Sequence, residues 1–291
     1  MKPIFILFLS LFIMKMNTLL AQDSVMKSPQ PEEKIGICLS GGGALGFAHI
    51  GALQALEEVG IKPNYVSGTS MGSIIGVLYA AGYSPAEILQ LIEKEKVYKI
   101  YNILKLDVTG KTGLAQSAKL RKILHNCIPY NTFDSLEKFF AVCCTDIKNG
   151  RASIFSSGNH LKEYVIASSS IPYIFKTVKI EGVEYVDGGI INNFPVEPLI
   201  EAQCDMIIGV SVVNFTPFTH EAGKLELLPL VFAIVDESIN KERYKQCHHF
   251  VAVKGMNTIE NHIFSFKNWK YIYQCGYESM REYLLEHPEM R

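Results

Sequence analysis

The stretch IGICLSGGGALGFAHIGALQALEEVG, residues 35–60, decides the fold class of this chain. Its first part, Ile35–Ser40, is a short apolar run that predicts a buried strand and leads directly into consecutive glycines. From His49 to Val59 the apolar residues recur at helical spacing, and Gly60 provides a stop signal. A strand, a glycine-rich turn and a helix in direct succession indicate the beginning of an α/β fold.

The alternation of strand and helix continues to the end of the chain. Further strands are expected at Tyr65–Ser67, Phe139–Thr145, Ala152–Phe155, Val183–Val186 and Met206–Val213. Further helices are expected between Ser70 and Gly82, from Ser84 onward, at Asn159–Ala167, and over residues 229–246 and 268–286. Strands that alternate with helices predict a three-layer α/β/α fold with a mainly parallel central sheet. Since no internal boundary interrupts the pattern, one domain from residue 35 to residue 287 is expected.

The composition is that of a globular protein and excludes several other classes. Of the 291 residues, 48% are apolar and 20% are charged, which excludes wholesale disorder. The 28 basic and 29 acidic residues leave a net charge of -1, so we expect no nucleic-acid partner. The seven cysteines form no C-x-x-C pair and no zinc-ligand spacing. We therefore expect buried thiols rather than a disulfide scaffold, and no metal site.

The first 21 residues are predicted to be a signal peptide. Lys2 gives the positive start, an apolar run follows, and a small-residue cleavage position falls at Ala21. The alternative is a membrane anchor over the same stretch, but Lys15 interrupts it at a cost of ~3 kcal/mol within a membrane. Residues 22–34 are polar and are expected to form a flexible lead-in. The expected location is therefore outside the cytoplasm: periplasmic, outer-membrane-associated or secreted.

The glycine loop GGGALG, Gly41–Gly46, lies between the first predicted strand and the first predicted helix. Consecutive glycines allow backbone N–H groups to point outward together, and beside a helix N-terminus such amides form an anion hole. The loop also matches the dinucleotide-binding pattern G-x-G-x-x-G. That alternative requires a carboxylate roughly 20 residues further on, at the end of the second strand. The matching stretch Val66–Ser70 contains none, which disfavours a nucleotide site.

A second motif stands where that carboxylate is missing. The pentapeptide Gly68-Thr69-Ser70-Met71-Gly72 is a G-x-S-x-G sequence between a predicted strand and a predicted helix. Such a tight turn needs small residues on both sides of the serine and projects its hydroxyl at the edge of the sheet. The pattern predicts a nucleophilic serine. The alternative is that Ser70 serves only as the N-cap of the following helix.

A third motif, Asp187-Gly188-Gly189, follows the predicted strand that ends at Val186. The two glycines allow the aspartate to lie on a tight turn at the end of the strand. Taken alone, this motif is equally typical of an ordinary Asp-Gly turn, which is common in proteins. Its functional meaning depends on the two motifs that precede it.

The three motifs together resemble the patatin-like phospholipase family (bacterial type), over nearly all of residues 35–285. The glycine loop, the G-T-S-M-G pentapeptide and the D-G-G turn occur in the order that is typical of the family. Further stretches that resemble it are His49–Leu53, Thr145-Asp146, Ala167–Pro172 and Asn192–Val196.

This resemblance implies a patatin-like fold and a lipid acyl hydrolase with a Ser–Asp dyad, without a cofactor or metal. Carried over by motif, Ser70 is the nucleophile, Asp187 is its base, and backbone amides near Gly42 and Gly43 form the oxyanion hole. The remaining motif glycines are Gly41, Gly46, Gly68, Gly72, Gly188 and Gly189. The implied substrate is a phospholipid, lysophospholipid or acylglycerol, met at a membrane or micelle surface.

Several alternatives stay open. The same dyad could transfer the acyl group to an alcohol, or the site could belong to an inactive lipid-binding protein. A Ser–Asp–His triad would need His248, with Asp205 or Asp236 as its acid. The chain also departs from the family at Leu45, where Arg or Lys is frequent, and we hypothesise that this apolar side chain faces the acyl chain.

Overall fold

The computed structural model describes residues 33–95, 111–172, 174–213, 224–256, 263 and 266–290. The chain divides into an N-terminal stretch that ends at Glu33 and a compact unit that begins at Lys34. The predicted signal peptide and nearly all of the lead-in lie outside the described residues, so both stay predictions.

Strands and helices alternate along the compact unit, as the sequence predicts. The strands are β1 (Ile35–Leu39), β2 (Tyr65–Thr69), β3 (Phe139–Asp146), β4 (Arg151–Phe155), β5 (Val178–Ile180), β6 (Val183–Asp187), β7 (Met206–Ser211) and β8 (His249–Ala252). The α-helices are α2 (Ala48–Glu58), α3 (Met71–Ala80), α4 (Pro85–Lys94), α5 (Lys111–Cys127), α6 (Leu161–Ser168), α7 (Glu197–Glu201), α8 (Lys224–Tyr244) and α9 (Trp269–Glu286). The 3-10 helices are η1 (Gly43–Phe47), η3 (Phe133–Ser135), η4 (Gly188–Ile190), η5 (Phe266–Asn268) and η6 (Pro288–Met290).

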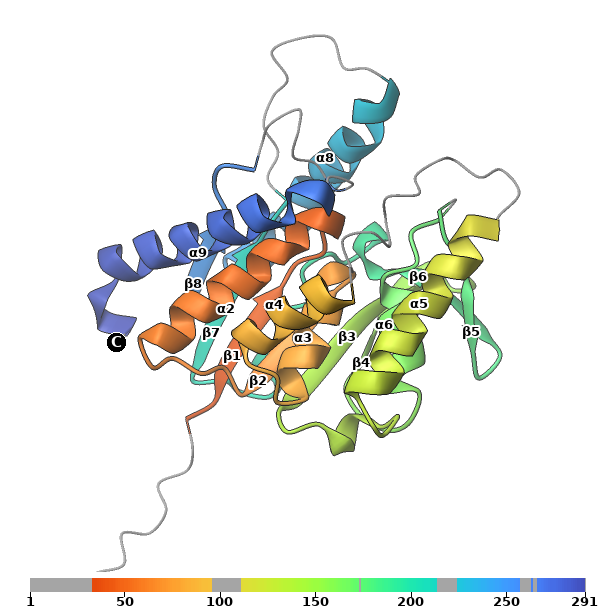
Figure 1. The fold of residues 1–291 in the computed structure, drawn as a ribbon, viewed down its shortest axis with the longest axis horizontal. Helices are drawn as coiled ribbons and strands as arrows, with labels where there is room; N and C mark the ends of the chain where they lie inside the picture. Colours follow the sequence, from red (N-terminus) through yellow and green to blue (C-terminus); the bar gives the residue numbers. More distant parts are fainter. Residues whose placement is uncertain are drawn as a thin grey trace, which may run out of the picture. The chain divides into compact units, whose positions relative to one another are not determined.

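The strands form one eight-stranded sheet in the order β5-β6-β3-β2-β1-β7-β8, with β4 also paired to β3 (Figure 1). Strands β3, β2, β1, β7 and β8 are parallel to one another. Strands β4 and β6 run antiparallel to β3, and Gly150 in the β3–β4 turn has a positive φ of 60°. The prediction of a mainly parallel central sheet is therefore confirmed.

Helices cover both faces of the sheet, which confirms the three-layer prediction. Alternate side chains of β1 point to opposite faces: Ile37 and Leu39 join the large core, and Cys38 joins a smaller one. The large core lies under α2, α3, α4, α6 and α9, which stand in front of the sheet in Figure 1. The smaller core includes Leu199 of α7 and packs against Tyr244 at the end of α8.

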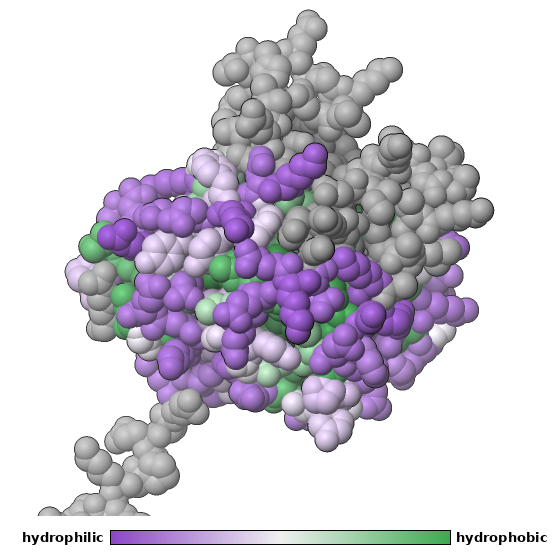
Figure 2. Space-filling view, viewed as in Figure 1, coloured by the Kyte–Doolittle hydropathy of each residue, from purple (hydrophilic) through white to green (hydrophobic). Residues whose placement is uncertain are grey.

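Hydrophilic side chains cover much of the outer face of the large helical layer, and apolar side chains show between them (Figure 2). No single helix in the described ranges is both long and apolar enough to cross a membrane. Helices α3 and α4 together meet the length and composition criteria, but they are bent by 120° at their junction. Every residue of α3 is buried.

Strand β3 positions the two motifs that the sequence singles out. Its residue Cys143 pairs with Thr69, the last residue of β2, and the next residue, Cys144, pairs with Asp187 at the end of β6. Strand β4 pairs with the same part of β3 along its other edge. Strands β2 and β6 therefore follow one another along one edge of β3. This arrangement brings Ser70 and Asp187 side by side, although they are far apart in the sequence.

Candidate active site

Ser70 lies on a strained turn between β2 and α3. Its backbone has φ 53° and ψ -124°, a conformation that is rare for a residue with a side chain and is often found at functional sites. Although Ser70 occupies the N-cap position of α3, its side chain makes no capping hydrogen bond. The N-cap alternative is therefore not supported, and the hydroxyl is available for another partner. The Ser168 hydroxyl accepts the Ser70 N–H at 2.9 Å and so helps to fix the turn.

Close backbone packing explains the two glycines of this turn. A Cβ atom at Gly68 would lie 2.6 Å from the backbone of Gly72, and one at Gly72 would lie 2.3 Å from the carbonyl oxygen of Leu39. Side chains at either position would push α3 away from the sheet. The glycines thus allow the short strand-to-helix connection that presents Ser70.

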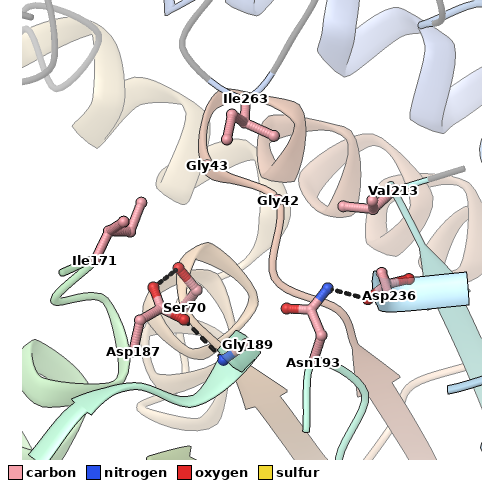
Figure 3. Close-up of a pocket in the computed structure, with 10 residues that line it drawn as sticks. All are labelled: Gly42, Gly43, Ser70, Ile171, Asp187, Gly189, Asn193, Val213, Asp236 and Ile263. Carbon is pink, nitrogen blue, oxygen red and sulfur yellow. Dashed lines mark hydrogen bonds between the residues drawn. The ribbon is translucent and has the colours of Figure 1, made fainter. Parts of the chain in front are cut away.

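The Ser70 hydroxyl donates a hydrogen bond to the Asp187 carboxylate, with Oγ and Oδ2 2.7 Å apart (Figure 3). The other carboxylate oxygen, Oδ1, accepts the N–H of Gly189 at 2.8 Å. Both side chains are buried, with exposed fractions of 6% for Ser70 and 5% for Asp187. The structure therefore brings together the two residues that the motifs suggest as nucleophile and base.

Burial raises the pKa of Asp187 to about 7, although the hydrogen bonds from Ser70 and Gly189 act in the opposite direction. Loss of hydration disfavours the charged form, and the two donors recover only part of this cost. A carboxylate with a pKa near neutrality is a much better proton acceptor than an exposed aspartate. The carboxylate is therefore suited to accept the hydroxyl proton of Ser70.

The glycine loop presents two unpaired amides to the same pocket. The neighbouring N–H of Ala44 donates to the carbonyl oxygen of Ile263 at 2.8 Å. The N–H groups of Gly42 and Gly43 have no hydrogen-bond acceptor among the described residues. Gly43 has φ 55°, and a Cβ atom there would lie 2.3 Å from the Ile263 oxygen. The loop thus places two backbone amides, without an acceptor among the described residues, at the pocket that contains Ser70, where such donors could stabilise a developing oxyanion.

Among the residues that the structure describes, ten line the pocket (Figure 3): Gly42, Gly43, Ser70, Ile171, Asp187, Gly189, Asn193, Val213, Asp236 and Ile263. Three of them are aliphatic and form its apolar part. Leu45 is not among them. Its side chain is buried in the large core and is not among the lining residues, so the hypothesis that Leu45 faces the acyl chain receives no support.

No histidine of the described ranges is among the lining residues of this pocket. His248 accepts the N–H of Ile207 through Nδ1 at 2.9 Å, so the Ser–Asp–His alternative receives no support. His49 is fully buried and its Nε2 hydrogen-bonds to the Ser40 carbonyl. Burial lowers the pKa of His49 to about 4, which keeps the ring neutral and structural.

Two polar residues of the pocket, Asn193 and Asp236, have no role in the Ser–Asp mechanism that the sequence predicts. Asn193 lies in a stretch noted only for its family resemblance, and Asp236 was considered only as the acid of the alternative triad. The second signal was weak, because Asp236 lies inside a helix and belongs to no motif. The structure shows that Asn193 donates a hydrogen bond from Nδ2 to Oδ1 of Asp236 at 2.5 Å.

Comparisons with known proteins agree with this geometry. Residues 37–200 match the family model described as patatin-like phospholipase. The uncharacterized protein R571 of Acanthamoeba polyphaga mimivirus is 27% identical over 295 residues, which cover 91% of this chain and 98% of the viral protein. The lysophospholipase nte1 of Emericella nidulans is 28% identical over 283 residues, which cover 86% of this chain but only 18% of the fungal protein.

A solved structure shows the same fold. VipD from Legionella pneumophila superposes with a TM-score of 0.51 at 17% sequence identity, covering 88% of this chain and 67% of VipD. None of these comparisons decides whether the chain is of the bacterial type, which stays a prediction. The matched segment 37–200 covers more than half of the chain and includes both Ser70 and Asp187. The chain belongs to the patatin-like phospholipase family.

Proposed function

We propose that this chain hydrolyses carboxylic ester bonds of lipids with Ser70 as nucleophile and Asp187 as general base. The family to which it belongs is one of lipid ester hydrolases. The observation that carries the proposal is the 2.7 Å hydrogen bond from Ser70 to Asp187, beside the amides of Gly42 and Gly43, which have no acceptor in the part of the chain that the structure describes. A serine hydroxyl needs such a base within hydrogen-bond reach to attack an ester carbonyl.

The reaction would proceed in two halves. Oγ of Ser70 attacks the ester carbonyl carbon while its proton passes to Asp187, and the negative charge that develops on the carbonyl oxygen is held by the Gly42 and Gly43 amides. Collapse of this intermediate breaks the ester bond, and Asp187 returns the proton to the leaving alcohol. Asp187 then deprotonates a water molecule that attacks the acyl-serine, which releases the fatty acid and restores the hydroxyl.

The pocket lining supports a lipid substrate. Ile171, Val213 and Ile263 add apolar lining around the polar groups, as an acyl chain would require (Figure 3). The related fungal protein carries the name lysophospholipase. We therefore place phospholipids, lysophospholipids and acylglycerols in the substrate class, met at a membrane or micelle surface and cleaved without a metal.

The test combines covalent labelling with a lipid panel. The purified protein is treated with a fluorophosphonate probe, and its hydrolysis of the three lipid classes is measured both with and without a metal chelator. Wild type and Ser238→Ala, a change at an exposed serine, should label and hydrolyse equally, whereas Ser70→Ala should do neither. Labelling of Ser70→Ala, or loss of wild-type activity on chelation, would contradict the mechanism. Products formed with glycerol present separate hydrolysis from acyl transfer.

Export through a signal peptide is a separate proposal that the sequence alone supports. Expression of the full chain followed by N-terminal sequencing of the exported protein should give Gln22 as the first residue. Recovery of the chain with Met1 at its N-terminus would count against cleavage after Ala21.

A further inference from the structure

A second buried carboxylate faces the pocket from the side opposite to Asp187. Asp236 of α8 is 4% exposed and lines the pocket together with Ser70. Its Oδ1 accepts the side-chain amides of Asn193 at 2.5 Å and Asn240 at 3.0 Å, and its Oδ2 accepts the Tyr244 hydroxyl at 2.5 Å. The mechanism above assigns no role to this carboxylate, although burial of an aspartate is costly.

Asn193 connects Asp236 to the glycine loop. Its backbone carbonyl accepts the N–H of Gly41 at 3.1 Å, and its Nδ2 lies 3.4 Å from the Gly41 carbonyl oxygen. A Cβ atom at Gly41 would lie only 2.2 Å from Oδ1 of Asn193, and a Cβ atom at Gly189 only 2.8 Å from it, so both positions need glycine. Asn193 thus fits closely between the glycine loop and the turn that carries Asp187. Because Asp236 binds its Nδ2, the orientation of this amide is fixed from α8.

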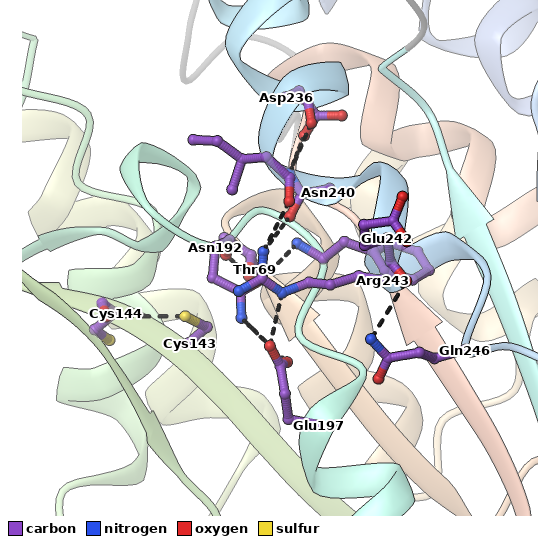
Figure 4. Close-up of polar contacts among 12 residues, drawn as sticks. Thr69, Cys143, Cys144, Asn192, Glu197, Asp236, Asn240, Glu242, Arg243 and Gln246 are labelled. Atoms are coloured by element: carbon purple, nitrogen blue, oxygen red, sulfur yellow. Dashed lines mark hydrogen bonds and ion pairs between the residues drawn. The ribbon is translucent and has the colours of Figure 1, made fainter.

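The connection is part of a ring between the residues after η4 and helices α7 and α8, which is formed by side-chain hydrogen bonds and closed by the peptide bond between Asn192 and Asn193. Figure 4 labels the members of this ring other than Asn193. In order, the ring contains Asn193, Asp236, Asn240, Arg243, Glu197 and Asn192. Arg243 donates to Glu197 at 2.6 Å and to Oδ1 of Asn240 at 3.2 Å. The ring also reaches the nucleophile turn, because the Thr69 hydroxyl donates to the Asn192 carbonyl at 3.0 Å.

We propose that Asp236 is a positioning residue for the oxyanion hole: through Asn193 it holds the glycine loop so that the Gly42 and Gly43 amides face the reacting carbonyl. This inference rests on the proposed ester hydrolysis. The glycine loop would stabilise the transition state through its backbone N–H groups, whose positions must match that of the oxyanion within a few tenths of an ångström. Asp236 touches neither the nucleophile nor its base, so its effect should reach the transition state only through the loop.

The test compares three substitutions on α8. Asp236→Ala removes the acceptor of the Asn193 amide, Asp236→Asn retains an oxygen at that position, and Glu237→Ala removes a carboxylate from the exposed neighbouring residue. For each variant kcat and KM are measured on an oxygen ester and on the corresponding thionoester. Sulfur accepts hydrogen bonds more weakly than oxygen, so an intact oxyanion hole favours the oxygen ester.

Asp236→Ala should lower kcat on the oxygen ester about 10- to 100-fold with KM nearly unchanged, as expected for a displaced oxyanion donor. Its rate on the thionoester should fall less, so the preference for oxygen over sulfur should decrease. Asp236→Asn should recover most of the activity, and Glu237→Ala should behave as wild type. A protein that is only less well folded would lose both reactions equally, and that result would overturn the proposal.

A second variant separates loss of the Asp236–Asn193 contact from a general folding defect of Asp236→Ala. Asn193→Ala removes the same contact from its other end and should lower the oxygen-to-sulfur preference to a similar extent. The double variant with Asp236→Ala should be no worse than the more impaired single variant, because both changes break one connection. Additive losses would overturn the proposal. If wild type lacked esterase activity altogether, the proposed function would fail instead, so the two failures are distinguishable.

Discussion

Two buried carboxylates face one pocket, and their surroundings differ in a way that separates their tasks. Asp187 receives one side-chain donor, the Ser70 hydroxyl, and one backbone donor, the N–H of Gly189. Asp236 receives three side-chain donors, two amides and the Tyr244 hydroxyl. In Figure 3 the glycine loop runs between the two carboxylates.

The two carboxylates differ in whether the groups that donate hydrogen bonds to them can also transfer a proton. The Ser70 hydroxyl can transfer its proton to Asp187 and become a nucleophile, and burial leaves that carboxylate with a pKa of about 7. The amides around Asp236 cannot release a proton under ordinary conditions, and burial together with the nearby Asp236 charge raises the pKa of the Tyr244 hydroxyl, so these donors hold the carboxylate in place. Burial likewise raises the pKa of Asp236, while its three donors act to lower it. One carboxylate is equipped for proton transfer and the other for orientation.

The largest effect should come from the residues that perform the proton transfer. Ser70→Ala and Asp187→Asn should each lower kcat/KM on a soluble ester by at least ~10³-fold, because nucleophile and base act as a unit. Asp134→Asn, at an exposed aspartate, is the matched control and should leave the rate unchanged. Steady-state kinetics on folded protein measures this, and an Asp187→Asn variant with near wild-type activity would remove Asp187 from the mechanism.

The pH dependence of the rate should report Asp187 rather than Asp236. Since the base must be deprotonated, kcat/KM on an uncharged ester should rise with pH and level off above the pKa of Asp187, about 7. At pH 5 the rate should be roughly 100-fold below the plateau. A pH–rate profile of Asp236→Asn should keep the same midpoint. A flat wild-type profile between pH 5 and pH 8 would contradict the assignment.

The same pKa shift should appear in the stability of the fold. Between pH 4 and pH 7 native Asp187 keeps a proton that the unfolded chain, with an aspartate pKa near 3.8, has released. The native state therefore binds more protons, and stability should decrease as the pH rises through this window. The loss from pH 5 to pH 8 should be about 3 kcal/mol relative to Asp187→Asn, measured by denaturant unfolding. Parallel stability curves for the two proteins would show that the pKa is not raised.

The smallest effect should come from the outermost donor to Asp236. Tyr244→Phe removes the hydroxyl bonded to Oδ2 but leaves the contact of Oδ1 with Asn193. Activity should stay within about 3-fold, while the unfolding free energy should fall by ~1–2 kcal/mol for the unpaired acceptor. Tyr130→Phe, at an exposed tyrosine, is the control for loss of a hydroxyl. A large loss of activity in Tyr244→Phe alone would mean that the hydroxyl, and not Asn193, conveys the effect.

Most of the strands and helices could be predicted from the sequence, whereas three short elements and one long helix could not. The helix expected over residues 268–286 is α9, and the strand expected at Phe139–Thr145 is β3. The prediction missed β5, β8 and α7, which have three, four and five residues. Segments this short carry too few residues to show a period, and their structure depends on neighbours that are distant in the sequence. Helix α5 was also missed although it has 17 residues, so shortness does not explain that difference.

The sequence by itself determined which chemical groups are present and in which local setting. These groups are a glycine loop that can expose amides, a serine on a tight turn, and an aspartate followed by two glycines. These are local properties, because backbone freedom and turn geometry depend on adjacent residues. Only the tertiary structure decided that Ser70 and Asp187 meet, since neighbouring residues of β3 hold them in register. The tertiary structure alone also placed Asp236 of α8 within hydrogen-bond distance of Asn193. Such contacts join residues far apart in the chain, and no local pattern encodes which of them will pair.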